Sequence, residues 1–373
     1  MADQQLHVDF DSLSFELRQR FWQRVGPMQC KLRHLGVAFG CESDNAISDV
    51  TLRELAGVAP RTPMKRGHFP ERGPRDVAAC DAIAAHGIVS LCVRSARLTD
   101  VSPVATSVRK VQASGSGITD AGLARATRIR FLATSCNRNI RTVAPFASSL
   151  RSLTAGVGCA IDDAALACAT RIQVLNAWGN PAIRTVAPFG ATLRKLRTDA
   201  RCGIDDAGLR CATRIEELDA SDDPKIRTVE PFAASLRILA ARDHCGINDA
   251  GLRHATRLMK LDASRNPCIR TVAPFAASLR VLKARYHCGI DDAGLAQATR
   301  IEELDAGGNA RICTVAPFAA TLRKLNANCR CGIDDAGLAP ATRLEELDAW
   351  DNDKITGPVV AAAIEARENP TSW

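Results

Sequence analysis

The chain has 373 residues, 46% apolar and only 4% aromatic, so it should fold around aliphatic side chains rather than stay disordered. Its formal charge is +8, but arginine recurs at fixed intervals without a basic run or interleaved aromatics, which disfavours nucleic-acid binding. No apolar stretch is long enough to span a membrane, and the acidic start is unlike a signal peptide. Fifteen cysteines without such a signal predict reduced thiols in the cytoplasm or nucleus.

Residues 1–56 are predicted to form a small helical segment. Leucine, phenylalanine and valine recur there at every fourth position, which places them on one helix face, and a Gly-Pro pair ends that helix. A second apolar stretch follows around Leu35 and Val37, and Ser48 could cap a short third helix.

This segment resembles an F-box. The residues that match the motif are Leu13, Glu16, Leu17, Phe21, Trp22, Val25 and Pro27, whereas Ser14 stands where the motif has proline. The resemblance implies that these residues dock a Skp-family adaptor of a cullin-type ubiquitin ligase. The alternative is that the helices only cap the domain that follows.

A linker rich in proline, glycine and arginine occupies residues 57–75, and a repeat domain is predicted over residues 76–356. The motif Cys-Gly-Ile-Asp-Asp-Ala-Gly-Leu returns with a period of 43 residues. Its isoleucines are Ile118, Ile161, Ile204, Ile247, Ile290 and Ile333. A fixed period in this range is typical of a solenoid of stacked repeats.

Two strands are predicted in each 43-residue unit, for example Ile215–Leu218 after an Ala-Thr-Arg sequence and Leu236–Leu239 after a Pro-Phe sequence. The steps between strands alternate between 21 and 22 residues. A parallel β-helix with coils of this length is the alternative architecture, but helix-start signals in each coil disfavour it.

The pattern L-x-x-L-x-A resembles the leucine-rich repeat, and Cys-x-Ile-x-Asp-x-Gly-Leu is similar to the cysteine-containing repeats of F-box/leucine-rich-repeat proteins. The resemblance implies an α/β solenoid shaped as a horseshoe. About 13 parallel strands would line its concave face, and short helices or turns its convex face. Alanine stands where a third leucine is expected, and cysteine comes one residue late.

Four sets of positions repeat with the coils. A polar residue expected to satisfy the turn backbone is asparagine throughout except at Asp223, a potential weak point. The cysteines of the motif are too far apart for disulfides, since equivalent coils lie about 9–10 Å apart, so they are predicted to be buried thiols. Acidic residues such as Asp205 should cap helix starts, and phenylalanines such as Phe189 should form an internal spine. Residues 357–373 are predicted to be a C-terminal capping helix and tail.

No nucleotide-binding loop, nucleophile elbow, zinc-protease or C-x-x-C motif occurs, so we predict neither an enzyme nor a cofactor. The pairs His244-Cys245 and His287-Cys288 look like metal ligands, but each stands alone on its coil, and no metal is predicted.

Function is predicted to reside on the concave face and its edges. Acidic and basic strands alternate there, and cross-strand pairing is the preferred interpretation of these charges. The candidate partner-binding residues are those that break the repeat just past the strands: Trp178, Arg242, Asp243, Arg265, Arg285, Tyr286, Arg330 and Trp350. Drift at unconstrained loop positions would explain them equally well.

These features predict a monomeric, non-enzymatic scaffold that binds a protein target on its concave face. With the F-box resemblance, it would be the substrate-recognition subunit of a ubiquitin ligase. One alternative is a stand-alone binding or structural repeat protein. Another, with less support, is a nucleic-acid-binding protein that uses arginine.

Overall fold

The computed structural model describes residues 6–9, 35–39, 88–93, 98–199 and 202–356. The chain divides into two compact units, residues 1–183 (unit 1) and residues 184–373 (unit 2). Each unit contains a stack of short parallel strands, and the connections that the structure describes form outer turns.

Unit 1 contains seven parallel strands that pair in chain order in its described residues. They are β1 (Leu6–Asp9), β2 (Leu35–Phe39), β3 (Ile88–Val93), β4 (Lys110–Gln112), β5 (Phe131–Ala133), β6 (Ser152–Thr154) and β7 (Val174–Asn176). Its outer turns are the 3-10 helices η2 (Ser102–Val104) and η3 (Ala144–Phe146), and the helices α4 (Asp120–Leu123) and α5 (Asp163–Leu166).

The described part of unit 2 contains eight parallel strands, again paired in chain order. They are β8 (Lys195–Arg197), β9 (Glu217–Asp219), β10 (Ile238–Ala240), β11 (Lys260–Asp262), β12 (Val281–Lys283), β13 (Glu303–Asp305), β14 (Lys324–Asn326) and β15 (Glu346–Asp348). The outer 3-10 helices are η4 (Ala187–Phe189), η5 (Glu230–Phe232), η6 (Ala273–Phe275) and η7 (Ala316–Phe318), and the outer α-helices are α6 (Asp249–Leu252), α7 (Asp292–Leu295) and α8 (Asp335–Leu338).

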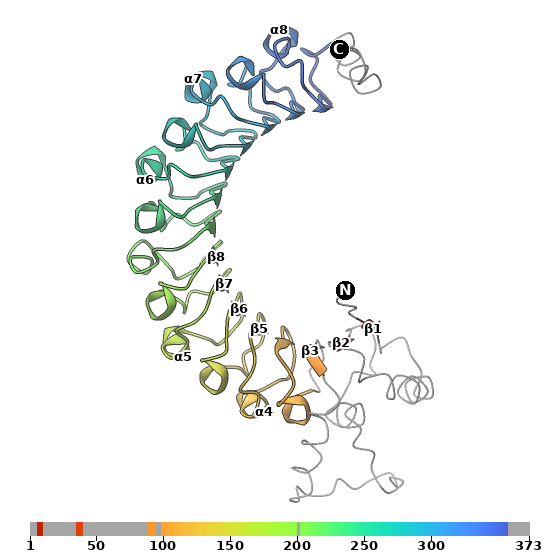
Figure 1. The fold of residues 1–373 in the computed structure, drawn as a ribbon, viewed down its shortest axis with the longest axis vertical. Coiled ribbons are helices and arrows are strands. Elements are labelled where there is room, and N and C mark those ends of the chain that lie inside the picture. The colour runs from red at the N-terminus through yellow and green to blue at the C-terminus, as the bar shows by residue number, and fades with distance from the viewer. Residues whose placement is uncertain (1–5, 10–34, 40–87, 94–97, 200–201, 357–373) are drawn as a thin grey trace, which may run out of the picture. The chain divides into compact units, whose positions relative to one another are not determined.

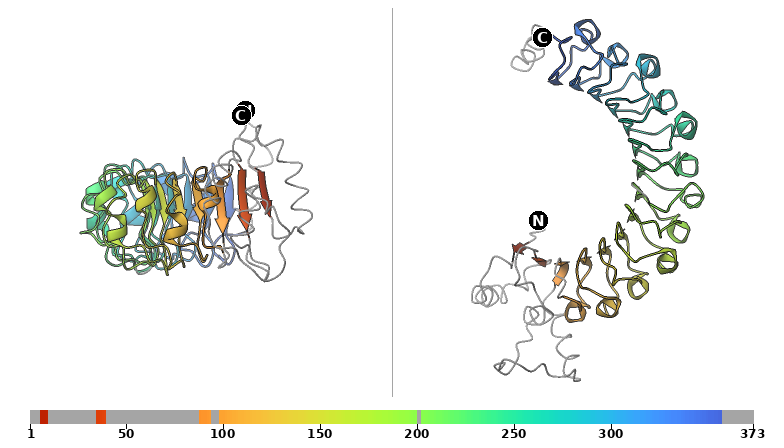
Figure 2. Two further views of the ribbon diagram at one scale, coloured as in Figure 1. Left: turned by 90° about the horizontal axis from the view of Figure 1, so that it is seen from below. Right: turned by 180° about the vertical axis from the view of Figure 1, so that it is seen from behind.

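The arrangement within unit 2 confirms the predicted α/β solenoid. Its strands line the concave side of the stack and its short helices lie on the convex side (Figure 1). The further views show the same inner layer of strands and outer layer of helical turns (Figure 2). The strands β3–β15, thirteen in all, fall within the predicted solenoid.

The strands β5–β15 begin two residues later and end one residue later than predicted, whereas β3 begins at Ile88 as predicted. The strand predicted over Ile215–Leu218, for example, is β9 (Glu217–Asp219). The first apolar residue of L-x-x-L packs in the core before strand pairing starts, as Ile215 does at 0% exposure. Hydrophobicity therefore marked the core contact, whereas the strand is set by backbone pairing.

The core of each coil is aliphatic, as expected from the composition. Leucines at the middle of strands β5–β14 are buried, whereas Leu347 of β15 is half-buried. Alanines that replace a third leucine are buried too, as at Ala220 and Ala263. Phenylalanines end the outer 3-10 helices and are at most 1% exposed: Phe146, Phe189, Phe232, Phe275 and Phe318. The predicted internal spine is thus confirmed within each unit.

Acidic and polar residues cap the outer α-helices as predicted. The Asp291 carboxylate, for instance, accepts a hydrogen bond from the backbone N–H of Gly294 at 2.9 Å. The Asp205 carboxylate makes the same bond to Gly208, although that segment is a turn rather than a helix.

Buried asparagines tie each coil to the one before it. The Nδ2 of Asn266 donates to the carbonyl oxygens of Ala241 (2.9 Å) and Ile247 (3.2 Å), and its Oδ1 accepts from the N–H of Cys268. Asp223 takes the same place in its own coil at 1% exposure, but its Oδ2 has no hydrogen-bond partner among the described residues. Burial raises the pKa of the Asp223 carboxyl.

The structure corrects part of the predicted helical N-terminal segment. Leu6–Asp9 and Leu35–Phe39 are strands that extend the sheet of unit 1. Their apolar residues alternate, as at Leu35, Val37 and Phe39, which is the period of a strand rather than of a helix. The matching F-box residues, the predicted linker and the C-terminal cap lie outside the described residues.

Candidate protein-binding face

Acidic and basic side chains pair across neighbouring strands of unit 2. Lys195 lies 2.6 Å from Glu217, Lys324 lies 2.9 Å from Glu346, and the hydrogen bond to Glu217 raises the pKa of Lys195. Cross-strand pairing is therefore confirmed for these charges. Because the pairs are exposed, each contributes only about 0.2–1 kcal/mol.

A second line of charges, here called the entry row, is formed by the residue directly before each strand. Its members stack through the backbone, since the N–H of Glu216 bonds to the carbonyl oxygen of Arg194 and the N–H of Arg237 to that of Glu216. In unit 2 the entry row is Arg194, Glu216, Arg237, Met259, Arg280, Glu302, Arg323 and Glu345. Each glutamate in it pairs with the arginine of the preceding coil.

A hollow of about 430 Å³ lies on the strand-lined face over β12–β15. Charged side chains of those strands line it: Lys283, Glu303, Asp305, Lys324, Glu346 and Asp348. Burial raises the pKa of the Asp305 carboxyl, whose Oδ1 accepts from the Gly307 N–H and lies 3.5 Å from Arg285 Nε. Lys283 is exposed and forms no ion pair among the described residues, so it is available to a partner.

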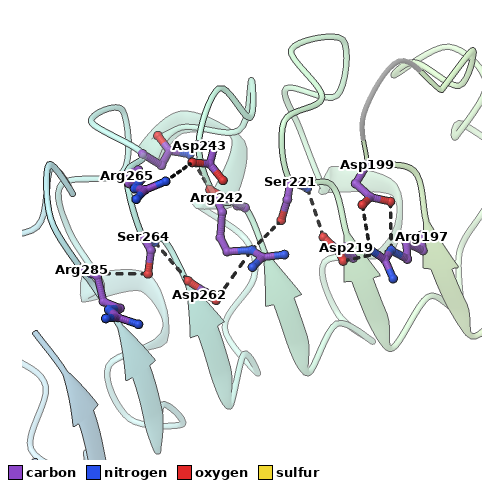
Figure 3. A network of polar contacts seen from close by, with 12 residues as sticks. Arg197, Asp199, Asp219, Ser221, Arg242, Asp243, Asp262, Ser264, Arg265 and Arg285 are labelled. Carbon is purple, nitrogen blue, oxygen red and sulfur yellow. Dashed lines mark hydrogen bonds and ion pairs between the residues drawn. The ribbon is translucent and has the colours of Figure 1, made fainter. Parts of the chain in front are cut away.

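Four of the predicted partner-binding residues are engaged in a polar network at the far end of the strands (Figure 3). Arg242 Nε donates to Ser221 Oγ at 3.1 Å and lies 3.8 Å from Asp262. Arg265 lies 3.7 Å from Asp243. The fourth, Arg285, pairs with Asp305 of the hollow. These contacts join neighbouring turns, so the four residues are engaged within the stack, and their contact with a partner stays a prediction.

Tyr286 packs between coils beside this network. Its ring lies 5.0 Å from the Arg265 guanidinium and 5.2 Å from that of Arg285. On the next coil, a Cβ at Gly308 would approach the Tyr286 ring to 2.6 Å, so only glycine fits there. Arg265 and Tyr286 also have φ values of 57° and 52°, a strained region for bulky residues.

The remaining predicted residues are exposed. Trp350, after β15, is 73% exposed, and Arg330 is exposed after β14. Trp178 is 39% exposed after β7, and it belongs to unit 1 rather than unit 2. The structure therefore places Trp350 and Arg330 in the turns beside the hollow of unit 2.

The recurring cysteines are unsuited to nucleophilic chemistry. Cys202, Cys245, Cys288 and Cys331 are buried and free, as predicted, whereas Cys159 at the same repeat position is free but half-buried. Burial raises the pKa of Cys245 to about 12, so that its thiol stays protonated at neutral pH. His244 is 92% exposed beside Asp222, and the part of the chain that the structure describes contains no group of side chains suited to a metal ion.

The described residues include no helix that is long and apolar enough to cross a membrane.

Comparison with known proteins identifies the fold. No protein-family model matches the chain, and no curated protein matches it. An internalin, InlF, from Listeria monocytogenes has a similar structure, with a TM-score of 0.53 at 18% identity over 94% of this chain and 92% of InlF. The fold is that of a leucine-rich-repeat solenoid. The functional domain of InlJ from Listeria monocytogenes, which includes a cysteine ladder, matches at a TM-score of 0.36 and 13% identity over 96% of this chain and 65% of that domain.

The hollow of this leucine-rich-repeat solenoid was not predicted. Its side chains, such as Glu303 and Lys324, occupy repeat positions that look alike in several coils. Among the predicted partner-binding residues, Arg285 pairs with Asp305 of the hollow, and Arg330 and Trp350 follow β14 and β15. Their contact with a partner stays a prediction, and the repeat charges gave no signal for the hollow.

Proposed function

We propose that this chain is a protein-binding scaffold and that the strand-lined face over β12–β15 holds a protein partner. The observation that carries the proposal is the hollow of about 430 Å³ on that face, with the exposed Trp350 in the turn that follows its last strand. A large exposed aromatic beside a recess is typical of a binding hot spot. The leucine-rich-repeat fold supports the same function, because solenoids bind partners on their concave surfaces.

The charges of the hollow favour a polar partner segment. Four carboxylates and two lysines line the recess, and Glu303 and Lys283 are exposed without an ion pair among the described residues. A partner that supplies a cation could pair with Glu303, and an anion of the same partner could pair with Lys283.

The test is a selection of peptides from a random display library against the full chain. We expect the selected peptides to lose at least about tenfold in affinity for Trp350→Ala, a typical hot-spot loss. Glu303→Lys should weaken them as well. Trp178→Ala in unit 1 is the matched control and should leave binding unchanged. Peptides that bind both hollow variants as tightly as the unmodified protein would refute the proposal.

A ubiquitin-ligase role is a narrower form of this proposal, supported by the F-box-like residues alone. It predicts that the full chain co-purifies with a Skp-family adaptor and that a Leu17→Ala, Phe21→Ala variant does not. If the full chain does not bind the adaptor, or if the variant binds it equally well, the ubiquitin-ligase role is refuted. The chain would then be a stand-alone binding protein.

We also propose that the protein has no catalytic activity of its own and resides in the cytoplasm or nucleus. Protonated, buried thiols at the repeat positions support the first part. The free cysteines among the described residues are compatible with a reducing compartment.

A further inference from the structure

The entry row of unit 1 differs in charge from that of unit 2. Its members are Arg109, Arg130, Arg151 and Gln173, and they stack through the backbone as in unit 2, because the Arg130 N–H bonds to the Arg109 carbonyl oxygen at 2.7 Å. Three successive coils therefore present arginine at a position where unit 2 alternates arginine with glutamate or Met259.

These arginines have no acidic counterpart among the described residues of their unit. None of Arg109, Arg130 and Arg151 forms an ion pair among the described residues, and neither do their neighbours Arg128 and Arg171. Burial, followed by repulsion from Arg128 and Arg130, lowers the pKa of Arg109. Burial and repulsion from Arg171 and Arg130 lower that of Arg151. The five guanidinium groups thus form a cluster of like charge.

The acidic residues of this region are used elsewhere. Residues 98–183 contain nine arginines and lysines but only four aspartates, and all four stand at the starts of outer turns. The Asp120 carboxylate, for example, accepts from the backbone N–H groups of Arg141 and Thr142. The Asp162 carboxylate accepts from the Ala165 N–H. They therefore leave the positive charge on the strand side of residues 98–183 uncompensated.

Part of the arginine cluster is held in place by the fold. The Arg109 Nη1 donates to the carbonyl oxygens of Thr106, Ser107 and Val108, and the Arg151 Nη1 to that of Leu150. These bonds use only Nη1, so the other N–H groups of the Arg109 and Arg151 guanidiniums take no part in them. Arg130, on the coil between Arg109 and Arg151, is exposed. Fixed guanidinium groups lose little conformational entropy when they bind an anion.

We propose that the entry row of unit 1, with Arg128 and Arg171, binds an acidic segment of a partner protein. Neighbouring strands lie about 4.8 Å apart, so the three stacked arginines span about 10 Å, or about three residues of an extended peptide. Guanidinium groups match carboxylates in charge and in the geometry of paired hydrogen bonds.

A protein segment fits this surface better than a nucleic acid does. Proteins that bind single-stranded nucleic acids usually combine a basic groove with aromatic side chains on which successive bases stack. Phe131 is the one aromatic residue in β4–β7, and the Lys110 ammonium already lies 5.1 Å from the centre of its ring. This surface extends the proposed protein-binding function beyond the hollow of unit 2, and the two sites can be tested independently.

The experiment measures binding of a fluorescent dodecapeptide of alternating glutamate and serine to the full chain at low salt. The acidic peptide should bind more tightly than its glutamine–serine analogue, and its affinity should fall as the salt concentration rises. The variant Arg128→Gln, Arg130→Gln removes two exposed charges that make no described side-chain hydrogen bond, and it should bind about tenfold more weakly. The control Arg280→Gln, Arg323→Gln removes two arginines of the same row that are already paired in unit 2, and it should bind as the unmodified protein does.

Three results would overturn the inference. One is equal binding of the acidic and neutral peptides, and another is full binding by the Arg128→Gln, Arg130→Gln variant. The third is displacement of the acidic peptide by an oligothymidylate dodecamer at a lower concentration than by unlabelled peptide, which would assign the surface to nucleic acid. Loss of binding at the hollow of unit 2 would not affect any of these measurements.

Discussion

Replacing Asp223 with asparagine should stabilise the solenoid by about 1–3 kcal/mol, the usual cost of a buried polar group without a partner. The Asp223 Oδ2 is buried without a hydrogen bond. At the equivalent position, the Nδ2 of Asn266 donates to carbonyl oxygens 25 and 19 residues earlier in the chain. The same offsets from residue 223 lead to Thr198 and Ile204, whose carbonyl oxygens an asparagine would reach. Urea denaturation followed by circular dichroism measures the gain.

The advantage of Asp223→Asn should depend on pH. Burial raises the pKa of Asp223 in the folded protein above the ordinary value of 3.8. Because the folded-state pKa is raised, the protonated carboxyl is favoured in the folded protein. The protein with Asp223 is therefore at its most stable below pH 3.8, and its stability falls as the pH rises through the folded-state pKa. The difference between the two proteins should therefore be small in acid and largest at neutral pH. The matched control Asn266→Asp should destabilise, and a pH-independent difference would contradict the assignment.

Replacing Phe275 with alanine should lower the free energy of unfolding by about 3–5 kcal/mol, the range for truncating a buried phenylalanine. The ring is 1% exposed at the end of η6. Each coil of a solenoid contacts only its two neighbours, so a cavity there weakens the interfaces on both sides. Urea denaturation gives the loss, and amide hydrogen exchange should show it concentrated in the coils around η6.

Phe131→Ala provides the comparison for Phe275→Ala. Phe131 is half-buried in β5 on the strand side of unit 1, so its truncation should cost less, about 1–2 kcal/mol. Equal losses for the two variants would mean that Phe275 does not belong to a tightly packed spine.

The repeat made most of the fold predictable from sequence. The spacing of the leucines and of residues such as Phe275 indicated parallel coils, a buried spine and thiols too far apart to pair. It also singled out Asp223, where one residue departs from a buried asparagine series. The predicted strand ends differ from the observed ones because the hydrophobic pattern indicates which residues are buried, not which residues pair through the backbone. The strands Leu6–Asp9 and Leu35–Phe39 were missed because a few alternating residues carry little signal beside a helical pattern.

The binding surfaces were harder to predict. Repetition conceals differences between coils, so Lys283 and Glu303 look like scaffold until the hollow over β12–β15 is seen. Conversely, Arg242 and Arg265 look like free contact residues, but the structure shows them in ion pairs between coils. Whether a charge is paired depends on its neighbours in the adjacent coils, about 21 residues away, which single positions do not reveal.

The alternation of charge along the entry row sets a rule for how the solenoid can change length. In unit 2, Arg194 precedes Glu216 and Arg323 precedes Glu345, so the charge pattern repeats only every second coil. Gain or loss of a single coil would place arginine beside arginine, whereas a step of two coils preserves every pair. The 43-residue period spans two coils, so duplication of a 43-residue unit keeps each arginine of the entry row beside a glutamate. Unit 1, with three arginines in succession, departs from this parity, and its exposed charge is what a partner could neutralise.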